Sequence, residues 1–150
     1  MASVDQPTFI PPDDRDAVRH ANQLFYRALD SLDLATMDRV WMQTRWAYCV
    51  HAGGDSIVGW DAVRKSWERI FSSTSWIRVT PTGVRIEIIS EVAVVTCAES
   101  IAAESEGDLG LAVAQATNLF RKTPEGWRLF HHHASSAPVY VTHPFSGTVQ

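Results

Sequence analysis

The chain has 150 residues, of which 45% are hydrophobic and 20% are charged, and this composition is typical of one globular domain with a substantial core. Its net charge of -4 and its scattered basic residues argue against nucleic-acid binding, which requires a basic face. No stretch approaches the roughly 20 apolar residues of a membrane-spanning helix, and the N-terminus lacks the basic start and apolar core of a secretory signal. Because Cys49 and Cys97 are expected to be buried, reduced thiols, we expect a cytoplasmic protein.

Three helices are predicted in the first half of the chain. Residues 1–12 are polar and contain prolines, so we expect a flexible arm, after which Asp13 and Asp14 are N-cap candidates. Apolar residues then recur at helical spacing in three stretches. They are Val18, Ala21, Phe25, Ala28, Leu29 and Leu32 in the first stretch, Leu34, Met37, Val40 and Trp41 in the second, and Val63, Trp67, Ile70 and Phe71 in the third. Asp33 is expected to cap the second helix and Asp61 the third.

Strands are predicted between the second and third helices and through the second half of the chain. Trp46–His51 reads as one strand and Ser56–Gly59 as a second, very short one. From residue 76 onward β-branched residues dominate. They predict four long strands joined as consecutive hairpins, in the stretches 76–89, 92–105, 111–121 and 127–136. Pro81 and Gly83 indicate a bend or bulge in the first of them, and residues 138–150 are expected to form an irregular extension.

This order of elements predicts an α+β domain over residues 13–137. The three helices precede a mostly antiparallel sheet of four long strands, with one or two short strands added among the helices. Long strands that contain bends would curl the sheet around the helices. The apolar faces of the helices would then fill part of the concave side and leave a cavity at its open end.

The last predicted strand carries the residues with the clearest chemical character. Residues 127–136 read W-R-L-F-H-H-H-A-S-S, and in an extended strand successive side chains point to opposite faces. On this alternation His131 and His133 share a face with Leu129 and look into the hollow. His132 then looks away from it, onto the outer face where dimers often pack.

Two further polar residues are expected on the same concave face. Antiparallel pairing that sets Lys122 opposite Trp127 also sets Asn118 opposite His131. On the preceding strand, Glu99 lies on the side that we assign to the hollow. The sequence therefore predicts an acid and an amide near the two inward histidines.

Three interpretations of these histidines remain open. In the first, His131 and His133 are half-buried structural residues that bond to Asn118 and to backbone carbonyls. In the second, a histidine is a general acid or base, since its ordinary pKa near ~6.5 suits proton transfer at neutral pH. Glu99 would then orient the imidazole, and Asn118 would hydrogen-bond a substrate oxygen. In the third, the pair binds zinc or iron together with His51.

Several motifs, taken in order, resemble the SnoaL-like branch of the nuclear transport factor 2-like superfamily, which also contains ketosteroid isomerases. The resemblance covers about residues 15–137. The matching motifs are Ser31-Leu32-Asp33, Trp41, Val50–Gly54, Gly59–Val63 with Trp67 and Phe71, Asn118–Arg121, and Gly126–Ser135. The resemblance implies a cone-shaped domain, usually dimeric, with a deep pocket between the helices and a strongly curved sheet. It implies no single activity, because members include isomerases, cyclases, dehydratases, hydrolases and non-catalytic modules.

Two positions depart from the ketosteroid isomerase pattern. His51 stands at the position that best matches the general-base aspartate of those enzymes. Their phenol-bearing helix position falls near Phe25, with Tyr26 adjacent to it. The resemblance therefore does not carry over the tyrosine and protonated aspartic acid that form their oxyanion hole, and steroid isomerisation is not expected.

These observations predict a protein that binds a small, largely apolar molecule and forms a homodimer. It is expected to be an isomerase, dehydratase or cyclase that uses histidine acid–base chemistry without a cofactor or a metal. The alternative is a non-catalytic ligand-binding or dimerisation module of the same fold. The catalytic candidates are His131, His51 and Glu99. The ligand-binding candidates are Asn118, His133, Tyr26, Trp41, Phe71 and Phe120.

Overall fold

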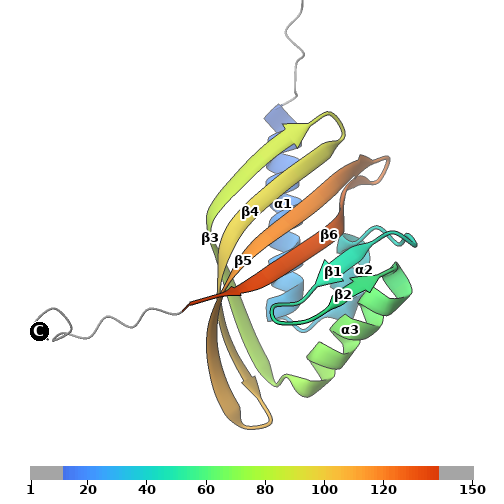
Figure 1. The fold of residues 1–150 in the computed structure, drawn as a ribbon. Coiled ribbons are helices and arrows are strands. Elements are labelled where there is room, and N and C mark those ends of the chain that lie inside the picture. The colour runs from blue at the N-terminus through green and yellow to red at the C-terminus, as the bar shows by residue number, and fades with distance from the viewer. Residues whose placement is uncertain (1–11, 139–150) are drawn as a thin grey trace, which may run out of the picture.

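The computed structural model describes residues 12–138 as three helices and one six-stranded sheet, which confirms the predicted α+β class (Figure 1). The predictions for residues 1–11 and 139–150 lie outside the described residues. The elements in chain order are α1 (Pro12–Asp30), α2 (Leu34–Val40), β1 (Tyr48–Val50), β2 (Ser56–Val58), α3 (Trp60–Ser73), β3 (Trp76–Ile89), β4 (Val92–Ser105), β5 (Asp108–Thr123) and β6 (Gly126–Ala137).

The strands form one sheet in the order β2-β1-β6-β5-β4-β3. The four long strands are consecutive antiparallel hairpins, as predicted, and the short strand β1 joins β6 in parallel. The turn between β4 and β5 is tighter than the gap between the predicted strands 92–105 and 111–121, since Ser105 pairs with Asp108. Glu106 and Gly107, the two residues between them, both have positive φ, as a type I′ hairpin turn requires.

The helices cover the concave side of this curved sheet. Figure 1 shows α1 running behind β3, β4 and β5, while α3 lies beside β1 and β2. The predicted stripe of α1 is buried at Val18, Phe25, Ala28 and Leu29. Burial of such side chains is the main source of stability for a helix of this kind, at about 1.5–3 kcal/mol for each large one. None of the three described helices combines the length and apolar character needed to cross a membrane.

The helix starts agree with the sequence in one case and differ in another. Asp33 caps α2, because its carboxylate accepts a hydrogen bond from the Ala35 N–H at 3.1 Å. The predicted cap of α3 is wrong: the helix begins at Trp60, and Gly59 with φ of 91° takes the N-cap position. Asp61 lies in the first turn instead, where its negative charge still favours the helix N-terminus.

The core lies between the three helices and the concave face of the sheet. Its largest fully buried side chains are Trp41, Phe25, Phe120, Met37 and Leu129. Cys49 and Cys97 are buried and free, as the sequence predicted.

Two irregularities interrupt the long strands. The pairing of β3 with β4 shifts between Thr82 and Arg85, which confirms the bend predicted from Pro81 and Gly83. The pairing of β5 with β6 also shifts, and no sequence signal predicted that second change.

The irregularity in β6 reverses the predicted alternation of its side chains. Phe120 pairs with Leu129 and Leu119 with His131, so Phe130 is the extra residue of a β-bulge. Past a one-residue bulge every side chain changes face. His132 consequently points into the interior, where 3% of it is exposed.

The predicted inward orientation of His131 and His133 is therefore wrong. His131 is half-buried on the outer face, and its ring stacks on Tyr48 with centroids 4.7 Å apart. His133 is exposed. The predicted pairing of Lys122 with Trp127 is confirmed, but Asn118 lies opposite His132, not His131, because the bulge intervenes.

Candidate functional site

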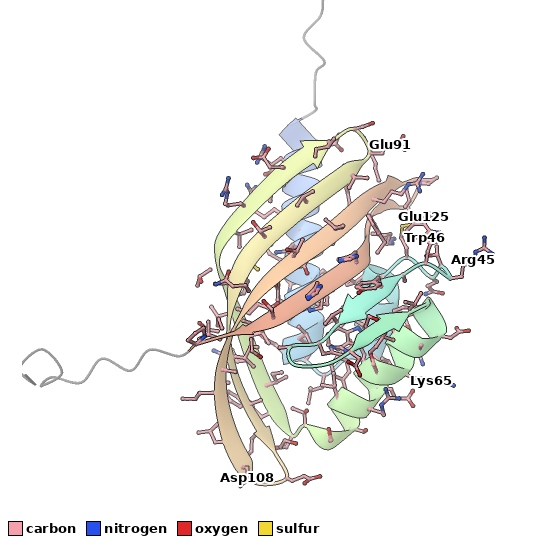
Figure 2. All side chains as sticks on the ribbon, viewed as in Figure 1. Arg45, Trp46, Lys65, Glu91, Asp108 and Glu125 are labelled. Carbon is pink, nitrogen blue, oxygen red and sulfur yellow. The ribbon has the colours of Figure 1, made fainter. Side chains whose placement is uncertain are left out.

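A chain of hydrogen-bonded polar side chains crosses the core from α1 to β6. His132 Nδ1 lies 2.6 Å from Asn118 Oδ1. Asn118 Nδ2 donates to Asn22 Oδ1 at 2.9 Å and to the Tyr26 hydroxyl at 3.1 Å. The Tyr26 hydroxyl in turn donates to Glu99 Oε2 at 2.6 Å. All five side chains are buried. The charged side chains labelled in Figure 2 extend instead from the surface of the molecule.

This network fixes the tautomer of His132. An amide oxygen only accepts hydrogen bonds, so His132 Nδ1 donates to Asn118, and in the neutral ring Nε2 keeps its lone pair. Burial, together with the neighbouring His51, lowers the pKa of His132 to about 3. The ring is therefore neutral near pH 7 and offers an acceptor at Nε2.

His51, directly after β1, is held in the same manner. Its Nε2 lies 2.9 Å from Ser66 Oγ, and that hydroxyl already donates to the Val63 carbonyl at 2.6 Å. His51 Nε2 must then be the donor, which leaves Nδ1 as an acceptor, 3.9 Å from the Cys49 thiol. Burial, and to a lesser degree the charge of Arg69, lowers the pKa of His51 to about 4. Its ring packs edge-on against Trp67 with centroids 4.5 Å apart.

Glu99 is the ionisable acid of the site. Burial raises the pKa of its carboxyl group, and the hydrogen bond from Tyr26 offsets part of that rise. Burial and the nearby Glu99 also raise the pKa of the Tyr26 phenol, so this hydroxyl keeps its proton. A carboxyl group with a raised pKa exchanges protons closer to neutral pH than an exposed one, which suits a general acid or base.

Glu99, His51 and His132 meet at a partly open cavity of about 120 Å³. The rest of its wall is apolar. The apolar residues are Leu29, Ala52, Trp67, Ile70, Ile77, Val79, Ile101 and Ala134. The cavity is smaller than the roughly 300–1,000 Å³ of sites for drug-sized ligands, so only a small molecule fits without rearrangement.

The structure brings four of the predicted site residues together. His51 and Glu99 line the cavity, while Tyr26 and Asn118 belong to the network behind it. Glu99 lies on the concave side of β4, as the sequence predicted.

Three predicted aromatic ligand-binding residues do not line this cavity. Trp41 packs against Trp60 and Phe71 against Trp67, with ring centroids 5.9 Å and 6.0 Å apart. Phe120 is fully buried in the core. These side chains fill the space between helices and sheet.

The outward orientation of His131 and His133 also places them away from His51, the third predicted metal ligand. His51 lies on the inner face, whereas His131 and His133 lie on the outer face of β6. Partial burial and the neighbouring His133 lower the pKa of His131. Among residues 12–138, no group of three or more histidine, cysteine, aspartate or glutamate side chains is arranged to hold a metal ion.

Sequence reasoning missed two members of the network. Strict alternation places His132 on the wrong face, because the bulge gives no local signal. Asn22 had a usable signal, since it lies four residues after Val18 and three before Phe25, within the apolar stripe of the first helix. A polar residue on a buried helix face requires a partner, and here the partner is Asn118.

Comparisons with known proteins agree with this architecture. Residues 18–140 match the family model of the SnoaL-like domain. A candidate dehydratase of the nuclear transport factor 2-like family from Streptomyces avermitilis is 33% identical, with a TM-score of 0.81, and the match covers 86% of this chain and 100% of that one. A candidate calcium/calmodulin-dependent protein kinase type II association domain from Thiobacillus denitrificans is 25% identical, with a TM-score of 0.70 and coverage of 80% and 94%.

One curated relative is a plant protein. The F-box protein SKIP8 of Arabidopsis thaliana is 26% identical over 119 residues, which are 79% of this chain and 49% of the plant protein. This chain therefore spans about half the length of that relative.

Proposed function

The chain belongs to the SnoaL-like family of nuclear transport factor 2-like proteins, and on that premise we propose that the cavity at Glu99 is a catalytic site. It catalyses proton transfer on a small carbonyl compound, as a dehydratase or isomerase without a cofactor. The observation that carries this proposal is the state of Glu99. One of its oxygens is held by Tyr26, its pKa is raised by burial, and the residue lines a mostly apolar cavity.

Glu99 is the proton carrier in this mechanism. Its carboxylate removes a proton from the carbon next to the substrate carbonyl. In an isomerisation the same group returns the proton to another carbon of the substrate. In a dehydration it delivers the proton to the leaving hydroxyl, the C–O bond breaks, and water and a C=C double bond form. Tyr26 positions the carboxylate for both reactions.

The two neutral imidazoles orient the substrate. His132 Nε2 and His51 Nδ1 carry lone pairs, so they accept hydrogen bonds from substrate hydroxyl groups.

Exchange of carbon-bound hydrogen tests the central step without knowledge of the natural substrate. The probes are cyclopentanone and cyclohexanone in D₂O, chosen for the small cavity, with α-hydrogen exchange followed by NMR. We expect the protein to accelerate exchange above the buffer rate and Glu99→Gln to reduce that acceleration by about 100-fold or more. The glutamine oxygen still accepts from Tyr26, so the fold is expected to persist. His131→Gln, on the outer face, is the matched control and should keep the full rate. Exchange at the buffer rate, or equal rates in the protein and Glu99→Gln, would refute the mechanism.

A non-catalytic dimerisation module is the second candidate function, and an exposed apolar patch favours it. The hairpin of β4 and β5 extends beyond the end of β6, as Figure 1 shows, and there Leu109 and Leu111 are 69% and 74% exposed. Exposed leucines that cluster on a sheet face mark an interaction surface. Sedimentation equilibrium should give a dimer for the protein and a monomer for Leu111→Asp. A monomeric parent protein would exclude this candidate.

A further inference from the structure

A second hollow, separate from the cavity at Glu99, lies between α1 and β3 and has a volume of about 270 Å³. Its polar wall comes from one face of α1, where the lining positions are four, three and one residues apart. These residues are Arg15, Arg19, Asn22 and Gln23. Its apolar wall comes from β3 beside the bulge and consists of Pro81, Val84 and Ile86. The hollow thus combines positive charge with a hydrocarbon surface.

Both arginines of this hollow keep hydrogen-bond donors that have no partner among the described side chains. Arg15 Nη1 donates to the Ile86 carbonyl at 2.8 Å, which ties its guanidinium to β3 and leaves its other N–H groups available. Arg19 forms an exposed ion pair with Asp16 through Nη1 alone. Asp16 does not line the hollow, and neither does any other carboxylate of the described residues. The lining therefore attracts anions.

Asn22 adds a donor that reaches the same space. Only 3% of this side chain is exposed, and its oxygen is occupied by the hydrogen bond from Asn118 Nδ2. Its amide nitrogen carries two N–H donors, and neither has a hydrogen-bond partner among residues 12–138, while the nitrogen itself reaches the hollow. An acceptor atom in the hollow would therefore meet an available donor on an otherwise fixed side chain.

We propose that this hollow binds a small organic carboxylate. The carboxylate lies against Arg15, Arg19 and the Asn22 amide, because guanidinium groups pair with the two oxygens of a carboxylate in a fixed, planar geometry. The apolar body of the ligand packs on the β3 wall, where an inorganic anion would leave hydrocarbon uncovered. The site is distinct from the cavity at Glu99, so this proposal does not depend on the proposed function.

Titration of the ¹⁵N-labelled full chain with sodium benzoate tests the site. We expect saturable NMR shifts in the Asn22 side-chain amide and in the Nε–H groups of Arg15 and Arg19. Benzyl alcohol carries the ring without the charge, and inorganic phosphate carries charge without the ring. Both should bind at least about tenfold more weakly than benzoate. Absence of saturable shifts, or equal binding of phosphate, would overturn the assignment of an organic carboxylate.

Variants locate the binding within the hollow. Arg19→Gln should weaken benzoate at least about tenfold without loss of the fold, because Arg19 is a surface residue. Arg27→Gln is the matched control, since Arg27 is exposed on α1 but does not line the hollow. Arg15→Lys keeps the positive charge but loses the planar guanidinium group, so it should also weaken binding. Unchanged affinity in both Arg19→Gln and Arg15→Lys would place the ligand elsewhere.

Discussion

The two faces of β6 give three consecutive histidines different chemistry. On the inner face, His132 donates to Asn118 and burial lowers its pKa to about 3. On the outer face, His131 stacks on Tyr48 and His133 is exposed. The side chains are identical, so the difference comes from the face on which each lies. The bulge at Phe130 decides that face.

Among the changes that distinguish the inner face of β6 from its outer face, Asn118→Leu is expected to have the largest effect on stability. This nearly isosteric change leaves His132 Nδ1, the Asn22 amide oxygen and the Tyr26 hydroxyl without their shared partner in the core. We expect the free energy of unfolding to fall by about 3 kcal/mol or more, measured by urea denaturation at pH 7. Thr117→Val, one residue away and half-buried, is the control and should change stability by no more than about 0.5 kcal/mol. Equal effects of the two changes would mean that the buried network contributes no specific stability.

The next expected difference between the two faces of β6 is the dependence of the free energy of unfolding on pH. The pKa of His132 is about 3 in the folded protein, against an ordinary value of about 6.5 for the unfolded chain. Between these values the unfolded chain binds a proton that the folded protein does not, so stability falls as pH falls from about 6.5 towards 3. One such histidine contributes a slope of about 1.4 kcal/mol per pH unit. His132→Gln should remove that contribution and flatten the profile of urea unfolding between pH 4.5 and 6.5. An unchanged slope would show that the ring titrates normally.

Much of the fold was predictable because it rests on local periodicity. The α1 stripe, the three consecutive hairpins of the long strands and the bend near Gly83 each follow from residue spacing or turn chemistry. The side of β4 that carries Glu99 was predictable as well, since β4 contains no bulge in its pairing with β5. These features need no knowledge of distant contacts.

The inward histidine was not predictable because its orientation depends on contacts between distant segments. Phe130 packs edge-on against Trp46, which lies just before β1. The Leu129 carbonyl accepts a hydrogen bond from the Met42 N–H at 2.7 Å. Such contacts stabilise one extra residue in β6 without any glycine or proline at the position. Strict alternation is therefore the natural prediction from sequence, and it places the wrong imidazoles inside.

Glu99→Gln should change the pH dependence of unfolding less than His132→Gln does, and in the opposite direction. Burial raises the pKa of Glu99, so between the ordinary pKa of a glutamate and the raised pKa in the folded protein, the folded protein holds a proton that the unfolded chain has lost. The stability from this group is present at low pH and is lost as pH rises through the folded pKa. The glutamine variant has no ionisation at this position, so its stability relative to the parent protein should increase between pH 5 and pH 8. Urea denaturation at both values measures the change, and a relative stability that is constant with pH would contradict the raised pKa.

The smallest effect is expected from His131→Ala, on the outer face. The change removes one ring that stacks on Tyr48 but leaves no buried polar group without a partner, so it should cost about 1 kcal/mol or less in urea denaturation. A double-mutant cycle with Tyr48→Ala isolates the stacking energy. A larger cost that grows with protein concentration would show that this face is covered by a second copy of the chain, because only an assembled interface makes stability depend on concentration. The outer histidines would then differ from His132 by the partner that covers them and not by exposure to solvent.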